Sequence, residues 1–168
     1  MRMRLLLVAA LVCAAVAVGV AVAANQNYNA HLVGDNEIPA NLSMGQGHAT
    51  CKLSADGTEL GCRLIASNIE NVVAAHIHVG PATANGPVVA FLYGNAPAGG
   101  GPTNGLLSEV TITAASLVGP LAGQPLSALI SEIESGNAYV NVHTNDGVAP
   151  VTNLPGDIPG GEIRGQLP

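Results

Sequence analysis

The chain has 168 residues and a formal net charge of −6. After residue 24 only Lys52, Arg63 and Arg164 carry fixed positive charge, against all 11 acidic residues, a formal charge near −8. Nucleic acids and anionic lipids are bound by clusters of Lys and Arg, so this composition argues against both as partners. With one Phe, three Tyr and no Trp, the chain also lacks the aromatic platforms on which bases stack.

Residues 1–24 have the layout of a secretory signal peptide. Two arginines precede an uncharged run rich in Leu, Val and Ala, which ends in small residues suited to signal peptidase. We expect cleavage after Ala23 or Ala24, leaving a single domain, 25–168. The alternative is an uncleaved membrane anchor, since about 20 apolar residues can span a bilayer. The sequence predicts an exported protein, secreted or held in the periplasm or cell envelope, with no stable membrane span after cleavage.

Short apolar or alternating runs, separated by Gly, Pro, Asn and Asp, occupy most of the predicted domain. Runs of this kind are typical of β-strands. Residues 94–105 have no periodicity and consist mainly of Gly, Pro, Ala and Asn, which predicts a surface loop. Strands are expected at 28–33, 47–53, 60–67, 74–79, 88–92, 107–112, 138–144 and 162–167.

One segment, at about 125–135, has the periodicity of an amphipathic helix. Gly136 is a natural stop for it, and we expect this helix to pack across an open end of the β structure. Many short strands with one helix predict a mainly β fold, an antiparallel immunoglobulin-like β-sandwich or a flattened barrel. The apolar residues at i, i+3, i+4 and i+7 of the helix are Leu126, Leu129, Ile130 and Ile133.

Cys51 and Cys62 are the two cysteines of the predicted domain, and Asp56-Gly57 between them is a strong hairpin signal. A turn centred on these two residues places position 51 directly opposite position 62. Opposed Cα atoms lie about 4.5–5.5 Å apart, a separation that a disulfide bond tolerates. Free thiols that bind a metal are the alternative, but the short spacing of thiolate sites is missing. We therefore predict a disulfide between Cys51 and Cys62.

Three parts of the sequence together resemble the CHRD (chordin) domain family. The opening motif is LVGDNEIP at 32–39, and the central motif is AAHIHVGP at 74–81 with NGPVV at 85–89. The closing motif is GNAYVNVHT at 136–144 with GGEIRGQL at 160–167. CHRD domains occur as repeats in chordin, an extracellular antagonist of bone morphogenetic proteins, and as single exported domains in microbial proteins. The resemblance implies a β-barrel or sandwich distantly similar to copper/zinc superoxide dismutase.

Residues 145–159 depart from the family pattern, in which a much shorter link joins the two halves of the closing motif. The link here is rich in Pro, Gly and Asn. We therefore expect the edge of the domain near His143 to be remodelled, and the sequence leaves open whether this loop covers the histidines.

Two predicted strands each carry histidines on a polar face. Because side chains alternate along a strand, His76 and His78 project to one side, as do Asn141 and His143 on the later strand. Two imidazoles at i and i+2 can chelate a transition metal ion, and a third from a neighbouring strand would complete the site. His76-Ile77-His78 is similar to the His-x-His pair that holds copper in superoxide dismutases. His76, His78 and His143 are therefore candidate ligands of copper or zinc, but the pattern favours the alternative, hydrogen-bonded surface histidines with Asn141 and Thr144 as partners.

Other polar residues could support such a site. Glu162 and Arg164 are at i and i+2 on the last strand, so they could hold the histidines or pair with each other, and we expect the ion pair. Glu37 is expected in a turn, where it caps backbone amides or binds a cation. His31 and His48 lie outside the closing motifs and are further candidate ligands.

Three functions fit these observations. We favour a non-enzymatic binding module that presents its histidine face to a metal ion, a protein or the cell envelope. The second is a copper-dependent redox enzyme of superoxide dismutase type, for which Arg164 is the one nearby charge able to guide an anion. The third is a structural or adhesive domain without a ligand. No Ser-His-Asp order, carboxylate pair or free cysteine nucleophile supports hydrolase chemistry, so no catalytic residue is predicted.

Overall fold

The computed structural model describes residues 26–168, so the predicted signal peptide and its cleavage site lie outside the described residues. This part of the chain forms eight antiparallel strands in a single sheet of spatial order β5-β4-β7-β8-β1-β2-β3-β6. The mainly β prediction is confirmed. The strands are β1 (Asn27–Val33), β2 (Gln46–Leu53), β3 (Leu60–Glu70), β4 (Val72–Val79), β5 (Val88–Tyr93), β6 (Pro102–Ile112), β7 (Ala138–Thr144) and β8 (Ile163–Leu167).

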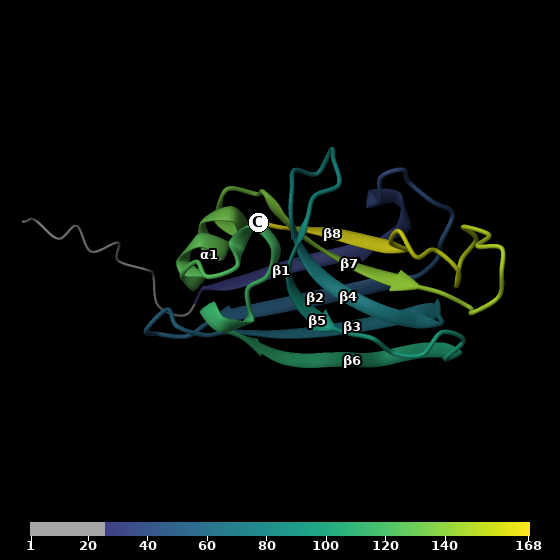
Figure 1. The fold of residues 1–168 in the computed structure, drawn as a ribbon, viewed down its shortest axis with the longest axis horizontal. Helices are drawn as coiled ribbons and strands as arrows, with labels where there is room; N and C mark the ends of the chain where they lie inside the picture. The colour runs from purple at the N-terminus through teal and green to yellow at the C-terminus, as the bar shows by residue number, and fades with distance from the viewer. Residues whose placement is uncertain (1–25) are drawn as a thin grey trace, which may run out of the picture.

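The sheet curls into a nearly closed, flattened barrel (Figure 1). β5 and β6 stand at the two ends of the strand order, yet they contact each other across the opening. All strands that are neighbours in this order are joined by antiparallel ladders. Of the two architectures expected, the flattened barrel is therefore the one adopted.

Aliphatic side chains fill the barrel, as the scarcity of aromatic residues requires. Burial alternates along β1 and β2, which places one face of each strand in the core. The predicted helix is confirmed as α1 (Leu126–Glu134), and its four periodic apolar residues are all buried. It packs beside one end of the barrel (Figure 1). Among residues 26–168 no helix has the length and apolar character needed to cross a membrane.

The predicted loop at 94–105 is partly wrong, because β6 already begins at Pro102. Its first residues pair with the end of β3, with Ile69 opposite Thr103 and Glu70 opposite Pro102. A register shift separates this stretch from the rest of the ladder, and Gly105 adopts a φ of 125° there. Ladder pairing with a strand more than 30 residues away extends β6, and hydrophobic periodicity contains no signal for such pairing.

The hairpin between β2 and β3 forms in the predicted register. The Ser54 amide donates to the Glu59 carbonyl at 2.8 Å, and Cys51 lies opposite Cys62. The two cysteines form a disulfide with a Cα–Cα separation of 4.1 Å, which confirms the prediction.

Replacing Cys51 and Cys62 together by alanine is expected to lower the free energy of unfolding by about 3 kcal/mol, because the closed loop restricts the unfolded chain. The sequence separation that sets this loop is 11 residues. Urea denaturation of the variant beside the wild type measures the difference. Wild-type protein denatured in reductant should lose a similar amount, and equal stability of all three samples would contradict the prediction.

Candidate metal centre

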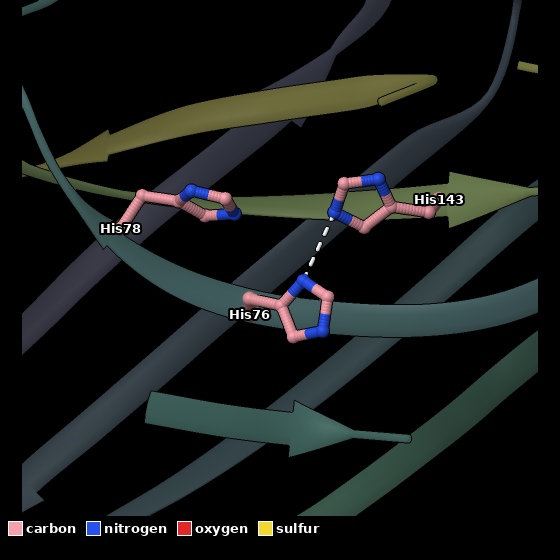
Figure 2. Close-up of side chains that lie close together, drawn as sticks. All are labelled: His76, His78 and His143. Carbon is pink, nitrogen blue, oxygen red and sulfur yellow. Dashed lines mark hydrogen bonds between the residues drawn. The ribbon is translucent and has the colours of Figure 1, made fainter. Parts of the chain in front are cut away.

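β4 and β7 are neighbours in the sheet, and together they bring three histidines to one place. His76 and His78 come from β4, while His143 comes from β7, where it lies opposite Ala74. Figure 2 shows the three rings gathered on one face, with His78 and His143 pointing toward each other. Sequence alternation predicted this shared face, and the β4–β7 pairing supplies the third ring.

The three imidazoles are close enough to share one ion. Nδ1 of His76 lies 3.0 Å from Nε2 of His143 (Figure 2). One nitrogen from each ring lies within 4.8 Å of the others. Ligand nitrogens about 2.0–2.1 Å from a zinc ion would be separated by a little over 3 Å in a tetrahedral site, so small side-chain rotations are enough to close the set.

Backbone carbonyls fix the tautomers of two of these rings. Nδ1 of His78 lies 2.8 Å from the Gly86 carbonyl oxygen, and Nδ1 of His143 lies 2.9 Å from that of Pro159. A carbonyl only accepts, so both Nδ1 atoms must carry the proton. Nε2 of each ring is then left with its lone pair, the form in which histidine binds a metal.

Burial keeps the histidines neutral. Burial, then repulsion from the His143 and His78 rings, lowers the pKa of His76 to about 4. Burial also lowers the pKa of His78 and of His143, although the carbonyls of Gly86 and Pro159 oppose this effect. At neutral pH all three rings are therefore uncharged, each with one N–H group and one nitrogen lone pair, which is the state that a metal requires.

Aromatic rings border the cluster. His76 meets the edge of Phe91 with ring centroids 4.9 Å apart, and Phe91 is half exposed. His78 is 7% exposed and stacks on Tyr139 with an interplanar angle of 9°. The Arg164 guanidinium carbon lies 3.4 Å from the Tyr139 ring centroid. The cluster is thus partly open near Phe91 and closed near Tyr139.

The expected ion pair between Glu162 and Arg164 does not form among the described residues. Arg164 is 1% exposed, and its guanidinium donates to the Pro81 and Ala84 carbonyls and to Asn85 Oδ1 at 2.8–3.1 Å. It therefore closes the loop between β4 and β5, and it is not free to guide an anion from solvent.

Glu162 belongs to a separate network that holds the 145–159 loop. It is 1% exposed, and its carboxylate accepts hydrogen bonds from the hydroxyls of Ser43 and Thr144 and from the Gly156 amide. The loop thereby packs back onto the barrel and delivers the Pro159 carbonyl to His143. The loop thus contacts the histidine cluster, which the sequence had left open.

Glu37 follows the turn at Gly34–Asn36, as expected. Its side chain, however, is only 5% exposed and lies beside Asn141 and Gly161. Burial raises the pKa of Glu37 to about 7, and the Arg164 charge, the Asn141 amide and the Ile38 backbone amide offset this only in part. Its Oε1 has no hydrogen-bond partner in residues 26–168. Asn141 lies opposite His76 in the β4–β7 ladder, so it borders the cluster as well as the carboxyl group.

The raised pKa of Glu37 predicts a pH-dependent difference between the wild type and a Glu37→Gln variant. The folded pKa exceeds the ordinary value of 4.5, so ionisation costs stability as the pH rises toward and past 7. Between pH 4.5 and pH 8, the free energy of unfolding of the wild type should fall by up to about 3 kcal/mol relative to that of the variant. The buried histidines act in the opposite direction, since their lowered pKa values cost stability as the pH falls below about 6.5.

The histidine contribution cancels when the two proteins are compared in EDTA by urea denaturation across this pH range. A difference that stays constant with pH would show that the Glu37 carboxyl group titrates normally.

Sequence reasoning missed the carbonyls that hold the rings. Gly86 positions His78 through its carbonyl oxygen, and a side chain at this position is excluded because a Cβ would lie 1.7 Å from the Val79 carbonyl oxygen. The Asn85-Gly86-Pro87 motif was the available signal. His31 and His48 were candidate ligands, but the structure places them on β1 and β2, outside this cluster.

Comparison with known proteins agrees with the motifs. The family model described as CHRD domain matches residues 28–167, nearly the whole chain. Searches of curated proteins and of solved structures give no significant match. The match begins within β1 and ends with β8, so it includes every strand of the barrel and all three histidines of the cluster. The chain belongs to the CHRD domain family.

Proposed function

We propose that this protein is an exported binding module that holds one copper or zinc ion on His76, His78 and His143. Export follows from the signal peptide expected at residues 1–24, and the disulfide fits an oxidising compartment. Membership of the CHRD domain family is compatible with a binding module.

The observation that carries this proposal is the state of His78 Nε2. This atom is buried and has no hydrogen-bond partner in the part of the chain that the structure describes. Buried polar atoms are almost always satisfied, so an unpartnered one calls for an explanation. A metal ion bound by this nitrogen and by the rings of His76 and His143 would supply the missing interaction.

The chemistry of the ligands limits which metal ions the site can bind. Imidazole suits copper, zinc, iron and nickel, and three neutral nitrogens leave a further position for water or another ligand. Without metal, the Nδ1–H group of His76 donates a hydrogen bond to Nε2 of His143. Binding through His76 Nδ1 requires its proton to move to Nε2, so metal uptake would replace this one hydrogen bond.

A superoxide dismutase-type enzyme receives no added support. Its one candidate guide for an anion, Arg164, is buried and hydrogen-bonded to three oxygen atoms. The open position beside Phe91 is compatible with metal storage or transfer, or with a ligand from a partner protein. Binding without turnover is therefore the function that these residues favour.

The test is calorimetric titration of the purified protein with copper(II), copper(I) and zinc(II), compared with a His76→Ala/His78→Ala variant. We expect wild-type binding tighter than the micromolar range to be lost in the variant, because two of three ligands are gone. Fold integrity is checked by circular dichroism.

Two further variants, His143→Ala and a control at an exposed residue, distinguish the loss of a metal ligand from a general effect of substitution on binding. His143→Ala should weaken binding at least tenfold, since even the hydrogen-bond partners of metal ligands are worth about 10- to 100-fold. The control is Phe91→Leu, which borders the cluster without offering a ligand and should bind normally. Weak binding that the histidine substitutions leave unchanged would reject the proposal and favour a structural or adhesive domain.

A further inference from the structure

His31 and His48, the two histidines outside the candidate metal centre, lie directly opposite each other on neighbouring strands. Burial alternates along β1 and β2, and both residues occupy exposed positions on the outside of the barrel. They also line one surface hollow of about 190 Å³. Two imidazoles that are far apart in the sequence thus share one patch of surface.

Opposed residues on antiparallel strands form either hydrogen-bonded or non-hydrogen-bonded pairs, and the non-hydrogen-bonded pairs have the shorter Cα–Cα separation. The hydrogen bonds of the β1–β2 ladder show which kind of pair His31 and His48 form. The Leu53 amide donates to the Gln26 carbonyl at 2.9 Å, which marks a hydrogen-bonded pair in the same register. Hydrogen-bonded and non-hydrogen-bonded pairs alternate along an antiparallel ladder. His31 is five residues beyond Gln26, so His31 and His48 form a non-hydrogen-bonded pair, whose Cα atoms lie about 4.5 Å apart.

The neighbouring ladder shows what such a position allows in this barrel. The bond from the Ser54 amide to the Glu59 carbonyl marks a hydrogen-bonded pair between β2 and β3. Three residues along, Cys51 and Cys62 therefore form a non-hydrogen-bonded pair, with a Cα–Cα separation of 4.1 Å. Their side chains are joined by a bond, so side chains at such pairs reach each other directly.

We propose that His31 and His48 form a second metal site, which binds one divalent ion such as zinc(II), nickel(II) or copper(II). Each ring contributes one neutral nitrogen, and water completes the coordination in the surface hollow. Exposed imidazoles on opposed positions can turn toward each other, because rotamer changes of exposed side chains take only picoseconds to nanoseconds. The site shares no residue with the three-histidine cluster, so it does not rest on the function proposed above.

The experiment is a calorimetric titration with zinc(II) and copper(II) at pH 7.5, using three proteins. These are the wild type, a His31→Ala/His48→Ala variant, and a His76→Ala/His78→Ala/His143→Ala variant. The proposal expects the third protein to retain one equivalent, and its affinity should fall at least tenfold when His48→Ala is added. The matched control is Asn29→Ala/Thr50→Ala, the preceding outward-facing pair of the same ladder, which should leave this equivalent unchanged.

The first two proteins decide the matter if the third does not fold. Loss of one equivalent from the wild type to the His31→Ala/His48→Ala variant supports the second site, and an unchanged stoichiometry overturns it. A wild type that binds a single equivalent, lost with His31 and His48 alone, would support this site and reject the three-histidine one. The proposal would also be overturned if the third protein retained its metal and the added His48→Ala substitution did not weaken that binding.

Discussion

Replacing Arg164 by methionine is expected to lower the free energy of unfolding by about 4 kcal/mol. The guanidinium is 1% exposed and bonded to three oxygens of the loop between β4 and β5. Methionine fills much of the same volume but leaves Asn85 Oδ1 and the carbonyls of Pro81 and Ala84 without their donor. It also removes the cation that lies over the Tyr139 ring.

Arg63 provides the matched control, since it is the other arginine of the barrel and pairs with Glu109 on an exposed surface. Arg63→Met should cost no more than about 1 kcal/mol, as exposed ion pairs usually do. Urea denaturation of both variants in EDTA measures the two effects without metal. If Arg164→Met proved as mild as Arg63→Met, the guanidinium would contribute no net stability to the β4–β5 loop.

Replacing Glu162 by methionine is expected to cost a similar amount, about 4 kcal/mol, and to weaken metal binding as well. Three donors lose their acceptor: the hydroxyls of Ser43 and Thr144 and the amide of Gly156. An unsatisfied buried group costs about 1–3 kcal/mol. The loop that presents Pro159 to His143 is then less firmly held, and losing the orientation of a ligand ring lowers metal affinity about 10- to 100-fold.

Two measurements separate the stability effect from the effect on the metal centre. Urea denaturation in EDTA gives the first, and titration with zinc(II) at a temperature where the variant is folded gives the second. Glu109→Met is the control, because its carboxylate is exposed and paired with the exposed Arg63. Normal metal affinity in folded Glu162→Met would show that His143 is oriented without the loop.

Arg164 and Glu162 together explain how the barrel supports the cluster. Arg164 closes the β4–β5 loop, which contains the Gly86 carbonyl that orients His78. Glu162 fixes the loop after β7, which contains the Pro159 carbonyl that orients His143. Each ring is thus held by a loop that a separate buried charge anchors. The sequence pattern predicted that these two residues pair with each other, but in the structure each holds a different loop beside the cluster.

The features that depend on local chemistry could be predicted from the sequence. Alternation of side chains placed His76 and His78 on one face, the Asp56-Gly57 turn set the register that joins Cys51 to Cys62, and helical periodicity located α1. These features follow from the geometry of a strand, a turn or a helix, which neighbouring residues control.

Which distant residues meet depends on the fold as a whole. Strand order brought His143 to His76 and paired His31 with His48, and it extended β6 into a segment without periodicity. It also separated Glu162 from Arg164. Such contacts depend on ladder pairing and loop packing between segments far apart in the chain, and a ladder can join any two strands whose backbone groups align. Local patterns therefore predicted what each strand presents, and closure of the barrel determined what it contacts.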